Sequence, residues 1–226
     1  MSEVAKMLNK IGQNRMQAEV FSSFCRLTAC ALAFQTREED YLEEAKRWKR
    51  EELDAFGAAM GALVNEMEDH PFEDRLGTIY MEMLGNNGAQ RGGEFHTPKC
   101  ICDLMARLTM DDYQWPEDGP VTISEPSCGG GAQILAVAQA VGTKRIHRLR
   151  VQAVDISRVA CDMCYINTTL WSIPTVVIHG NTLSLETWGA WPNWAMLQNA
   201  PITHHQWLTL TTQIPAAQET QPELAL

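Results

Sequence analysis

The sequence predicts an α/β fold in which a parallel sheet follows an α-helical N-terminal region. Two observations carry this prediction. Short apolar strands alternate with helical stretches after residue 120, and apolar residues recur at helical spacing over residues 1 to about 85. A glycine-dense turn between the first strand and the helix after it, residues 125–135, then indicates where the sheet would bind a ligand.

The N-terminal region reads as three helical stretches. Apolar residues recur mostly three to five positions apart from Val4 to Phe34, a second stretch runs from about Glu38 to Glu68, and a third from Phe72 to Leu84. Residues 85–93 are rich in glycine and asparagine and predict a loop. We therefore expect a helical domain over residues 1–92, an α/β cofactor domain over 93–212 and a disordered tail over 213–226.

The α/β region begins with Thr97-Pro98 and a helix over 99–108, because proline suits the first turn of a helix. Strands rich in β-branched residues are predicted at 121–124, 151–154 and 175–178, with a fourth at 194–197. Helices at about 131–141 and 157–170 fill the gaps. Strands that alternate with helices predict a parallel sheet with right-handed crossovers.

The charge of the chain disfavours a stand-alone, sequence-independent nucleic-acid binder. The formal net charge is −10, and no lysine or arginine follows Arg158. One dense basic cluster, which either contacts phosphates or forms a solvated loop, consists of Lys144, Arg145, Arg148 and Arg150. No long apolar run or signal-peptide pattern is present, so we expect a cytoplasmic protein without membrane contact.

The seven cysteines do not indicate a disulfide framework, because their number is odd and the chain reads as cytosolic. Cys161 and Cys164 have the spacing of zinc ligands, and Cys100 with Cys102 could be their partners. Both pairs lie in helical patterns rather than in knuckle loops. We therefore expect packing residues and no metal site.

The glycine turn predicts a ligand site at the carboxyl end of the first strand. Gly129, Gly130 and Gly131 allow a sharp bend and a close approach to a ligand, and the free N–H groups of the next helix start favour a polar or anionic group. Asp155 and Asn181 follow the second and third strands. Asp155 either accepts hydrogen bonds from ribose hydroxyls or caps the next helix. The glycine spacing does not match dinucleotide or phosphate-loop patterns.

Four ordered segments resemble the adenine-N6 DNA methyltransferases, most closely the modification subunits of type I restriction systems. These segments, together with a similar helix from Phe72 onward, cover roughly residues 70–185. They are Gly-Glu-Phe-His-Thr-Pro at 93–98, Glu-Pro-Ser-Cys-Gly-Gly-Gly at 125–131, Asp-Ile-Ser at 155–157 and Gly-Asn-Thr-Leu at 180–183.

The resemblance implies a Rossmann-like methyltransferase core that binds S-adenosylmethionine. In this reading Asp155 takes the ribose hydroxyls, Asn181 faces the adenine ring, and Ile156 is a further cofactor-binding residue. The residues implied at the methionine end are Phe95, Thr97, Pro98, Glu125, Ser127, Gly129, Gly130 and Gly131. A sulfonium cofactor carries no phosphate, so a glycine turn with nearby carboxylates suits it better than a basic loop.

The resemblance also implies a catalytic Asn-Pro-Pro-aromatic motif after the fourth strand. That motif accepts the hydrogens of the adenine amino group and stacks on a flipped base. The best counterpart is Asn199-Ala-Pro201-Ile, in which one proline and the aromatic residue are replaced, and the sheet is shortened. Trp191-Pro192-Asn193-Trp194 is a rival match in the wrong order.

Several functions therefore remain open from the sequence. The chain is a DNA adenine-N6 methyltransferase that needs a partner for target recognition, such as a specificity subunit or a second copy. Alternatively, it is an inactive relative that keeps the cofactor pocket for regulation. A purely structural protein and methylation of another substrate are the remaining readings.

Overall fold

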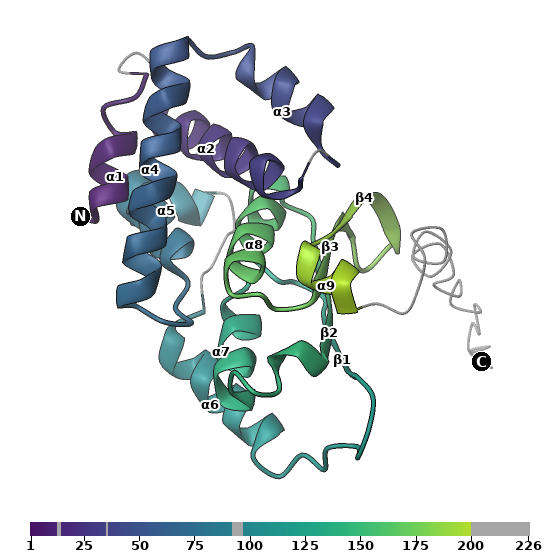
Figure 1. Ribbon diagram of the computed structural model, residues 1–226. Helices are drawn as coiled ribbons and strands as arrows, with labels where there is room; N and C mark the ends of the chain where they lie inside the picture. Colours follow the sequence, from purple (N-terminus) through teal and green to yellow (C-terminus); the bar gives the residue numbers. More distant parts are fainter. Residues whose placement is uncertain (13–14, 35, 92–96, 200–226) are drawn as a thin grey trace, which may run out of the picture.

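The computed structural model describes residues 1–12, 15–34, 36–91 and 97–199. A group of N-terminal helices lies on one side of helix α8 (Arg158–Leu170), and a small sheet lies on the other side (Figure 1). The glycine turn follows the first strand of this sheet.

The sheet has four strands within the described residues, and they lie side by side in chain order. Its strands are β1 (Val121–Glu125), β2 (Leu149–Asp155), β3 (Thr175–Asn181) and β4 (Glu186–Pro192). β1, β2 and β3 are parallel, and β4 runs antiparallel to β3. The carboxyl ends of the three parallel strands therefore meet at one edge, which we call the carboxyl edge. The three strands predicted at 121–124, 151–154 and 175–178 are confirmed.

Helices connect and cover the parallel strands on one face. α7 (Ala132–Val141) connects β1 to β2, with a short 3-10 turn at Ile146–Arg148, and α8 (Arg158–Leu170) connects β2 to β3. α6 (Lys99–Met110) packs on α7 through the buried side chains of Cys102 and Ala106. The predicted helices at 99–108, 131–141 and 157–170 are thus confirmed.

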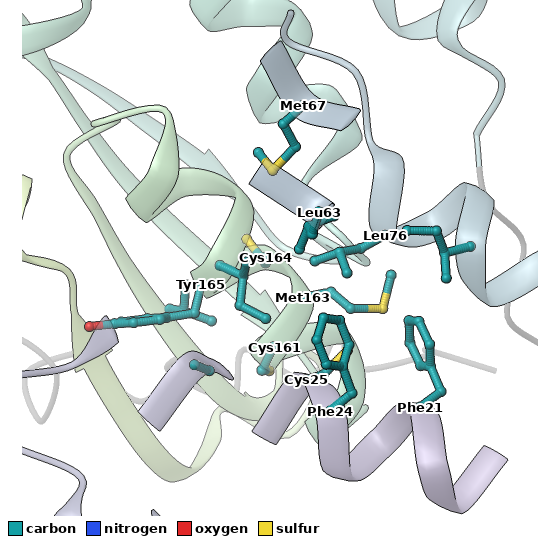
Figure 2. Packing of buried hydrophobic residues seen from close by; sticks show 14 of the residues in the cluster. Phe21, Phe24, Cys25, Leu63, Met67, Leu76, Cys161, Met163, Cys164 and Tyr165 are labelled. Atoms are coloured by element: carbon teal, nitrogen blue, oxygen red, sulfur yellow. The ribbon is translucent and has the colours of Figure 1, made fainter. Parts of the chain in front are cut away.

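Five helices precede α6 in the chain, and α8 is their main contact with the sheet. α2 packs along α8, which in turn covers β2 and β3. Phe21, Phe24 and Cys25 of α2 point toward Cys161 and Met163 of α8 (Figure 2). One continuous buried cluster therefore runs from the N-terminal helices into the sheet. The five helices are α1 (Glu3–Leu8), α2 (Gln17–Leu32), α3 (Glu38–Ala45), α4 (Arg50–Asp69) and α5 (Arg75–Arg91).

The predicted fourth strand at 194–197 is wrong, because these residues begin helix α9 (Trp194–Asn199). Asn193 explains the helix: its side-chain oxygen accepts the N–H of Met196 at 2.9 Å, as a helix N-cap does, and also the N–H of Thr175 at 3.2 Å. The last strand is instead β4, which returns antiparallel and ends at Pro192. Met196 packs on Val176 and Ile178, on the sheet face away from α8.

The predicted loop at 85–93 is also wrong over residues 85–91, which continue helix α5. Glycine and asparagine lower helix propensity but do not forbid a helix that begins on a buried face. Leu76 and Ile79 of α5 are fully buried. The division of the chain at residue 92 stays a prediction. None of the helices in the described ranges has the length and apolarity that a bilayer crossing requires.

Candidate cofactor site

The glycine turn leaves β1 at Glu125 and enters α7 at Ala132. Gly131 is the N-cap of α7 with φ 89°, and Gly129 has φ 51°, a backbone region that favours glycine. The N–H of Cys128 donates to the carbonyl of Val154 at 2.9 Å, which ties the turn to the end of β2. A Cβ at Gly129 would meet nothing within 4 Å, so the backbone there faces open space.

Asp155 holds the turn and the start of α8 at once. One carboxylate oxygen accepts the N–H of Gly129 at 2.8 Å, and the other accepts the N–H of Ser157 at 2.8 Å. Ser157 is the N-cap of α8. The helix cap is thus Ser157, whose hydroxyl accepts the N–H of Ala160 at 3.4 Å, and Asp155 supports the cap residue from behind. Since each carboxylate oxygen has two lone pairs, this role is compatible with hydroxyl binding by the same half-buried group.

Glu125 brings a second carboxylate to the carboxyl edge. Burial raises the pKa of Glu125, and the nearby Asp155 carboxylate raises it further, whereas the N–H of Ser127 at 3.3 Å opposes both. Two carboxylates near one turn create a negative potential. This edge is therefore suited to a cationic or hydrogen-bond-donating ligand group.

The loop after β3 closes the third side of the carboxyl edge. The hydroxyl of Thr182 donates to the carbonyl of Pro126 at 2.6 Å, across the end of β2. The side-chain oxygen of Asn181 accepts the N–H groups of Leu183 at 2.9 Å and Ser184 at 3.3 Å, so Asn181 shapes this loop. The predicted residues Glu125, Ser127, Gly129, Asp155 and Asn181 therefore gather at the ends of adjacent strands.

Apolar surface lies beside these polar groups. The side chain of Ile156 is 62% exposed directly after Asp155, and Leu183 is 97% exposed. The carbonyl of Ile156 lies 3.2 Å from Nε2 of His179, which stands on β3 opposite Asp155. Burial lowers the pKa of His179, which favours the neutral imidazole. An aromatic ligand ring would find an apolar surface next to hydrogen-bonding groups here.

Thr97 and Pro98 line a cavity of about 480 Å³ next to the glycine turn. Its walls come from the segment before α5 and from the N-terminal halves of α5, α6 and α7, and they include Asp74 and Ala132. Pro98 is the N-cap residue of α6. Phe95, the third residue predicted in this segment, lies outside the described residues.

Asp74 and Asn167 belong to this region, and the sequence analysis did not identify them. Nδ2 of Asn167 donates to the carboxylate of Asp74 at 2.9 Å and to the carbonyl of Gly130 at 2.8 Å. Asparagine is a poor interior helix residue, so its presence at position 167 inside the helix predicted at 157–170 is a sequence signal that could have indicated a tertiary role.

The basic cluster lies at the opposite edge of the sheet. Lys144, Arg145 and Arg148 precede β2, whose seven residues separate them from Asp155 by about 20 Å. Arg148 donates to the carbonyls of Gly119 at 3.0 Å and Pro116 at 2.7 Å. Arg145 and Arg148 also stack on Trp115, and Arg150 donates to the carbonyl of Leu149 at 2.7 Å. Three of the four residues thus have intramolecular contacts.

The predicted catalytic residues are at the border of the described part. Asn199 is the last residue of α9, while its side chain and Pro201 lie outside the described residues. Their prediction assumed a fourth strand that ends at the carboxyl edge. The chain instead enters α9 next to Thr175, at the opposite end of β3.

The cysteines have no disulfide partners, and Cys161 and Cys164 are fully buried on α8 (Figure 2). A hydrogen bond with Cys164 and burial raise the pKa of Cys128 well above its ordinary value, so the thiol in the glycine turn stays protonated. Within the described ranges, no three histidine, cysteine or acidic side chains are grouped as metal ligands.

Comparison with solved structures identifies the class of fold. A putative class I S-adenosylmethionine-dependent methyltransferase from Listeria monocytogenes matches 80% of this chain and 53% of its own, with 18% identity and a TM-score of 0.50. The chain thus has the fold of class I methyltransferases.

Sequence comparison identifies the family. The family model for N-6 DNA methylase matches residues 72–221, and the chain belongs to this family. The methylase subunit of the type I restriction enzyme MpnII from Mycoplasma pneumoniae is 26% identical over 135 residues. This match covers 55% of the chain and 24% of the relative, so the chain spans about a quarter of that protein. The resemblance noted in the sequence is confirmed.

Proposed function

We propose that this chain binds S-adenosylmethionine at the carboxyl edge and serves in methylation of adenine N6 in DNA. The observation that carries the proposal is the pair of half-buried carboxylates around an open glycine turn, with Asp155 already fixed by the N–H of Gly129 at 2.8 Å. The cofactor would supply an electrophilic methyl group on a sulfonium. The residues of this chain would bind and orient it.

The residues present fit the chemistry of this cofactor. Asp155 has lone pairs left for ribose hydroxyls, and the exposed side chain of Ile156 offers apolar contact to an adenine ring. Glu125 and the backbone of Gly129–Gly131 would receive the ammonium and carboxylate of the methionine end. Thr97 and Pro98 would line that end from α6, together with Phe95. Asn181 would lie near the adenine through the loop that it shapes.

The DNA substrate and the partner are inferred from the family. The relative from Mycoplasma pneumoniae is named as a subunit of a type I restriction enzyme, which supports a DNA substrate and a specificity subunit or second copy as partner. The acidic net charge supports the need for a partner. If the basic cluster around Arg145 contacts phosphates, it does so about 20 Å from the cofactor edge.

Calorimetric titration of the whole chain with S-adenosylmethionine tests the site. Asp155→Ala is expected to weaken binding about 10-fold or more, because hydrogen bonds to a charged group contribute about 1.5–3 kcal/mol each. Asp155→Asn keeps the shape of the side chain but only one of the two oxygens that accept from Gly129 and Ser157, so it should weaken binding less than Asp155→Ala. The matched control is Asp118→Ala, an exposed carboxylate at the other edge. No binding by the wild type, or equal binding by Asp155→Ala, would contradict the proposal.

A second candidate function is a cofactor-binding relative without transferase activity. It is favoured by β4 and α9, which occupy the part of the sequence where the family motif would follow a parallel strand. Incubation with labelled S-adenosylmethionine and duplex DNA separates the two candidates. Label recovered as N6-methyladenine, and lost in Asn199→Ala, supports the transferase. Cofactor binding without transfer supports the second candidate.

A further inference from the structure

The glycine turn is held from behind by a small polar cluster that joins the N-terminal helices to the sheet. Asp74 precedes α5, and its Oδ1 accepts the N–H of Gly77 at 2.9 Å, as a helix cap does. The same oxygen accepts Nδ2 of Asn167 at 2.9 Å. Asn167 lies in α8, is fully buried and also donates to the carbonyl of Gly130 at 2.8 Å.

The contact between Asp74 and Gly130 leaves no room for a side chain. A Cβ at Gly130 would lie 2.7 Å from Oδ2 of Asp74 and 3.0 Å from the terminal methyl of Met163. A Cβ at Gly131 would lie 3.2 Å from the sulfur of Cys164. Only at Gly129 is the space open. The turn is therefore closely packed on its α5 and α8 side.

We propose that Asp74 and Asn167 are positioning residues that clamp Gly130 and so hold the glycine turn in its ligand-binding shape. The turn has two residues in the left-handed region, at Gly129 and Gly131, and a flexible glycine segment would lose much entropy on ordering. The clamp orders the carbonyl of Gly130 between these two positions before a ligand arrives. Its role in cofactor binding rests on the function proposed above, whereas its role in ordering the turn does not.

The clamp also makes the helices before residue 92 part of the candidate site. Asp74 reaches the turn from the start of α5 and at the same time lines the cavity with Thr97 and Pro98. Movement of α5 would therefore alter the turn through a contact between residues 93 positions apart in sequence.

Hydrogen–deuterium exchange of the free chain tests the clamp without any ligand. In Asn167→Ala and Asp74→Ala, amides of residues 128–131 are expected to exchange about 10-fold faster, because each loses a hydrogen bond in a buried region. Asp74→Asn keeps the accepting oxygen for both Gly77 and Asn167, so its amides at residues 128–131 should exchange more slowly than those of Asp74→Ala.

The matched control is Asn193→Ala. Asn193 is equally buried and donates to the carbonyl of Ile173 at 2.8 Å, on the opposite side of the sheet. The substitution Asn193→Ala should lower global stability without a selective increase in amide exchange at residues 128–131. Unchanged exchange in the two clamp variants, or the same selective increase in Asn193→Ala, would overturn the clamp. If Asn167→Ala does not fold, the half-buried Asp74 gives the decisive comparison between alanine and asparagine.

Cofactor titration then separates this inference from the proposed function. Asp74→Ala should weaken the binding of S-adenosylmethionine more than the binding of 5′-methylthioadenosine, which lacks the amino-acid end that the turn would hold. Equal loss for both compounds would contradict a role in positioning the turn for the cofactor. If the wild type binds neither, the proposed function fails, and the exchange result alone decides whether the clamp exists.

Discussion

Glu125 is a residue whose charge state should govern ligand binding. Burial, followed by the field of Asp155, raises its pKa, so the fold disfavours the ionised form. A folded-state pKa above the unfolded value means that the unfolded state loses its proton first. The stability contributed by protonated Glu125 is therefore lost as the pH rises through this range. Glu125→Gln should accordingly be neutral or stabilising at pH 7.

The same shift predicts the pH dependence of cofactor affinity. If Glu125 receives the methionine ammonium, it must be ionised, so affinity should fall as the pH is lowered from neutral through its raised pKa. Binding should release a proton in that range, since the cation favours the carboxylate. Titrations in buffers with different ionisation enthalpies measure this release. Glu125→Gln should abolish it, and a release that persists in this variant would assign the proton to another group.

At the scale of one element, the geometry of the glycine turn predicts different losses of stability for substitutions at two neighbouring glycines. Gly130→Ala forces Asp74 away and should cost about 1–3 kcal/mol of unfolding free energy, as overpacking does. The new methyl group in Gly129→Ala would point into open space, so the left-handed backbone at φ 51° is its main cost, about 1 kcal/mol of unfolding free energy. Urea unfolding compares the two. Because the new methyl at residue 129 points into open space at the candidate site, Gly129→Ala should weaken S-adenosylmethionine despite its smaller effect on stability.

The elements differ in how well local sequence predicts them. β1, β2, β3 and the helices between them follow from apolar strands that end in turn residues, a signal contained in a few neighbouring positions. The run Trp194–Leu197 is apolar enough for a strand, but the side chain of Asn193 caps this segment as a helix. The same side-chain oxygen is held in place by the N–H of Thr175, a contact that the local sequence does not show. Residues 85–91 likewise have loop composition and yet extend a helix that is anchored by Leu76 and Ile79.

The candidate site shows the same division. Asp155 and the glycines were predicted because their types and order are visible in the sequence. Asp74 and Asn167 were not, because their meaning arises only when α5 and α8 meet at Gly130. Long-range side-chain contacts of this kind leave at most a weak local sign, here an asparagine in the middle of a helix.

At the scale of the whole molecule, a buried ionic cluster joins the N-terminal helices to α8 and β4. Asp162 of α8 is 1% exposed and pairs with Nε of Arg26 at 2.6 Å and Nη2 of Arg37 at 2.9 Å. The guanidinium groups of Arg37 and Arg158 lie 4.5 and 4.1 Å from the ring centre of Trp191. The cluster thus links α2, the start of α3, α8 and β4 around one carboxylate.

Removing that carboxylate should destabilise the helices and the sheet together. Asp162→Asn leaves buried guanidinium groups without their counter-charge, which typically costs about 3–5 kcal/mol. Since whole domains are stable by only about 5–15 kcal/mol, the unfolding midpoint should fall markedly. Asp40→Asn is the matched control, because Asp40 is 39% exposed and its pairing with Arg158 is partly solvated.

Unfolding of the helices and the sheet should also be cooperative. Circular dichroism, which reports the helices, and tryptophan fluorescence should give one coincident transition in each variant, since one buried cluster spans both regions. Two separate transitions would instead mean that residues 1–92 unfold as an independent domain, and Asp162→Asn should then affect both of them, because its ion pairs bridge the boundary.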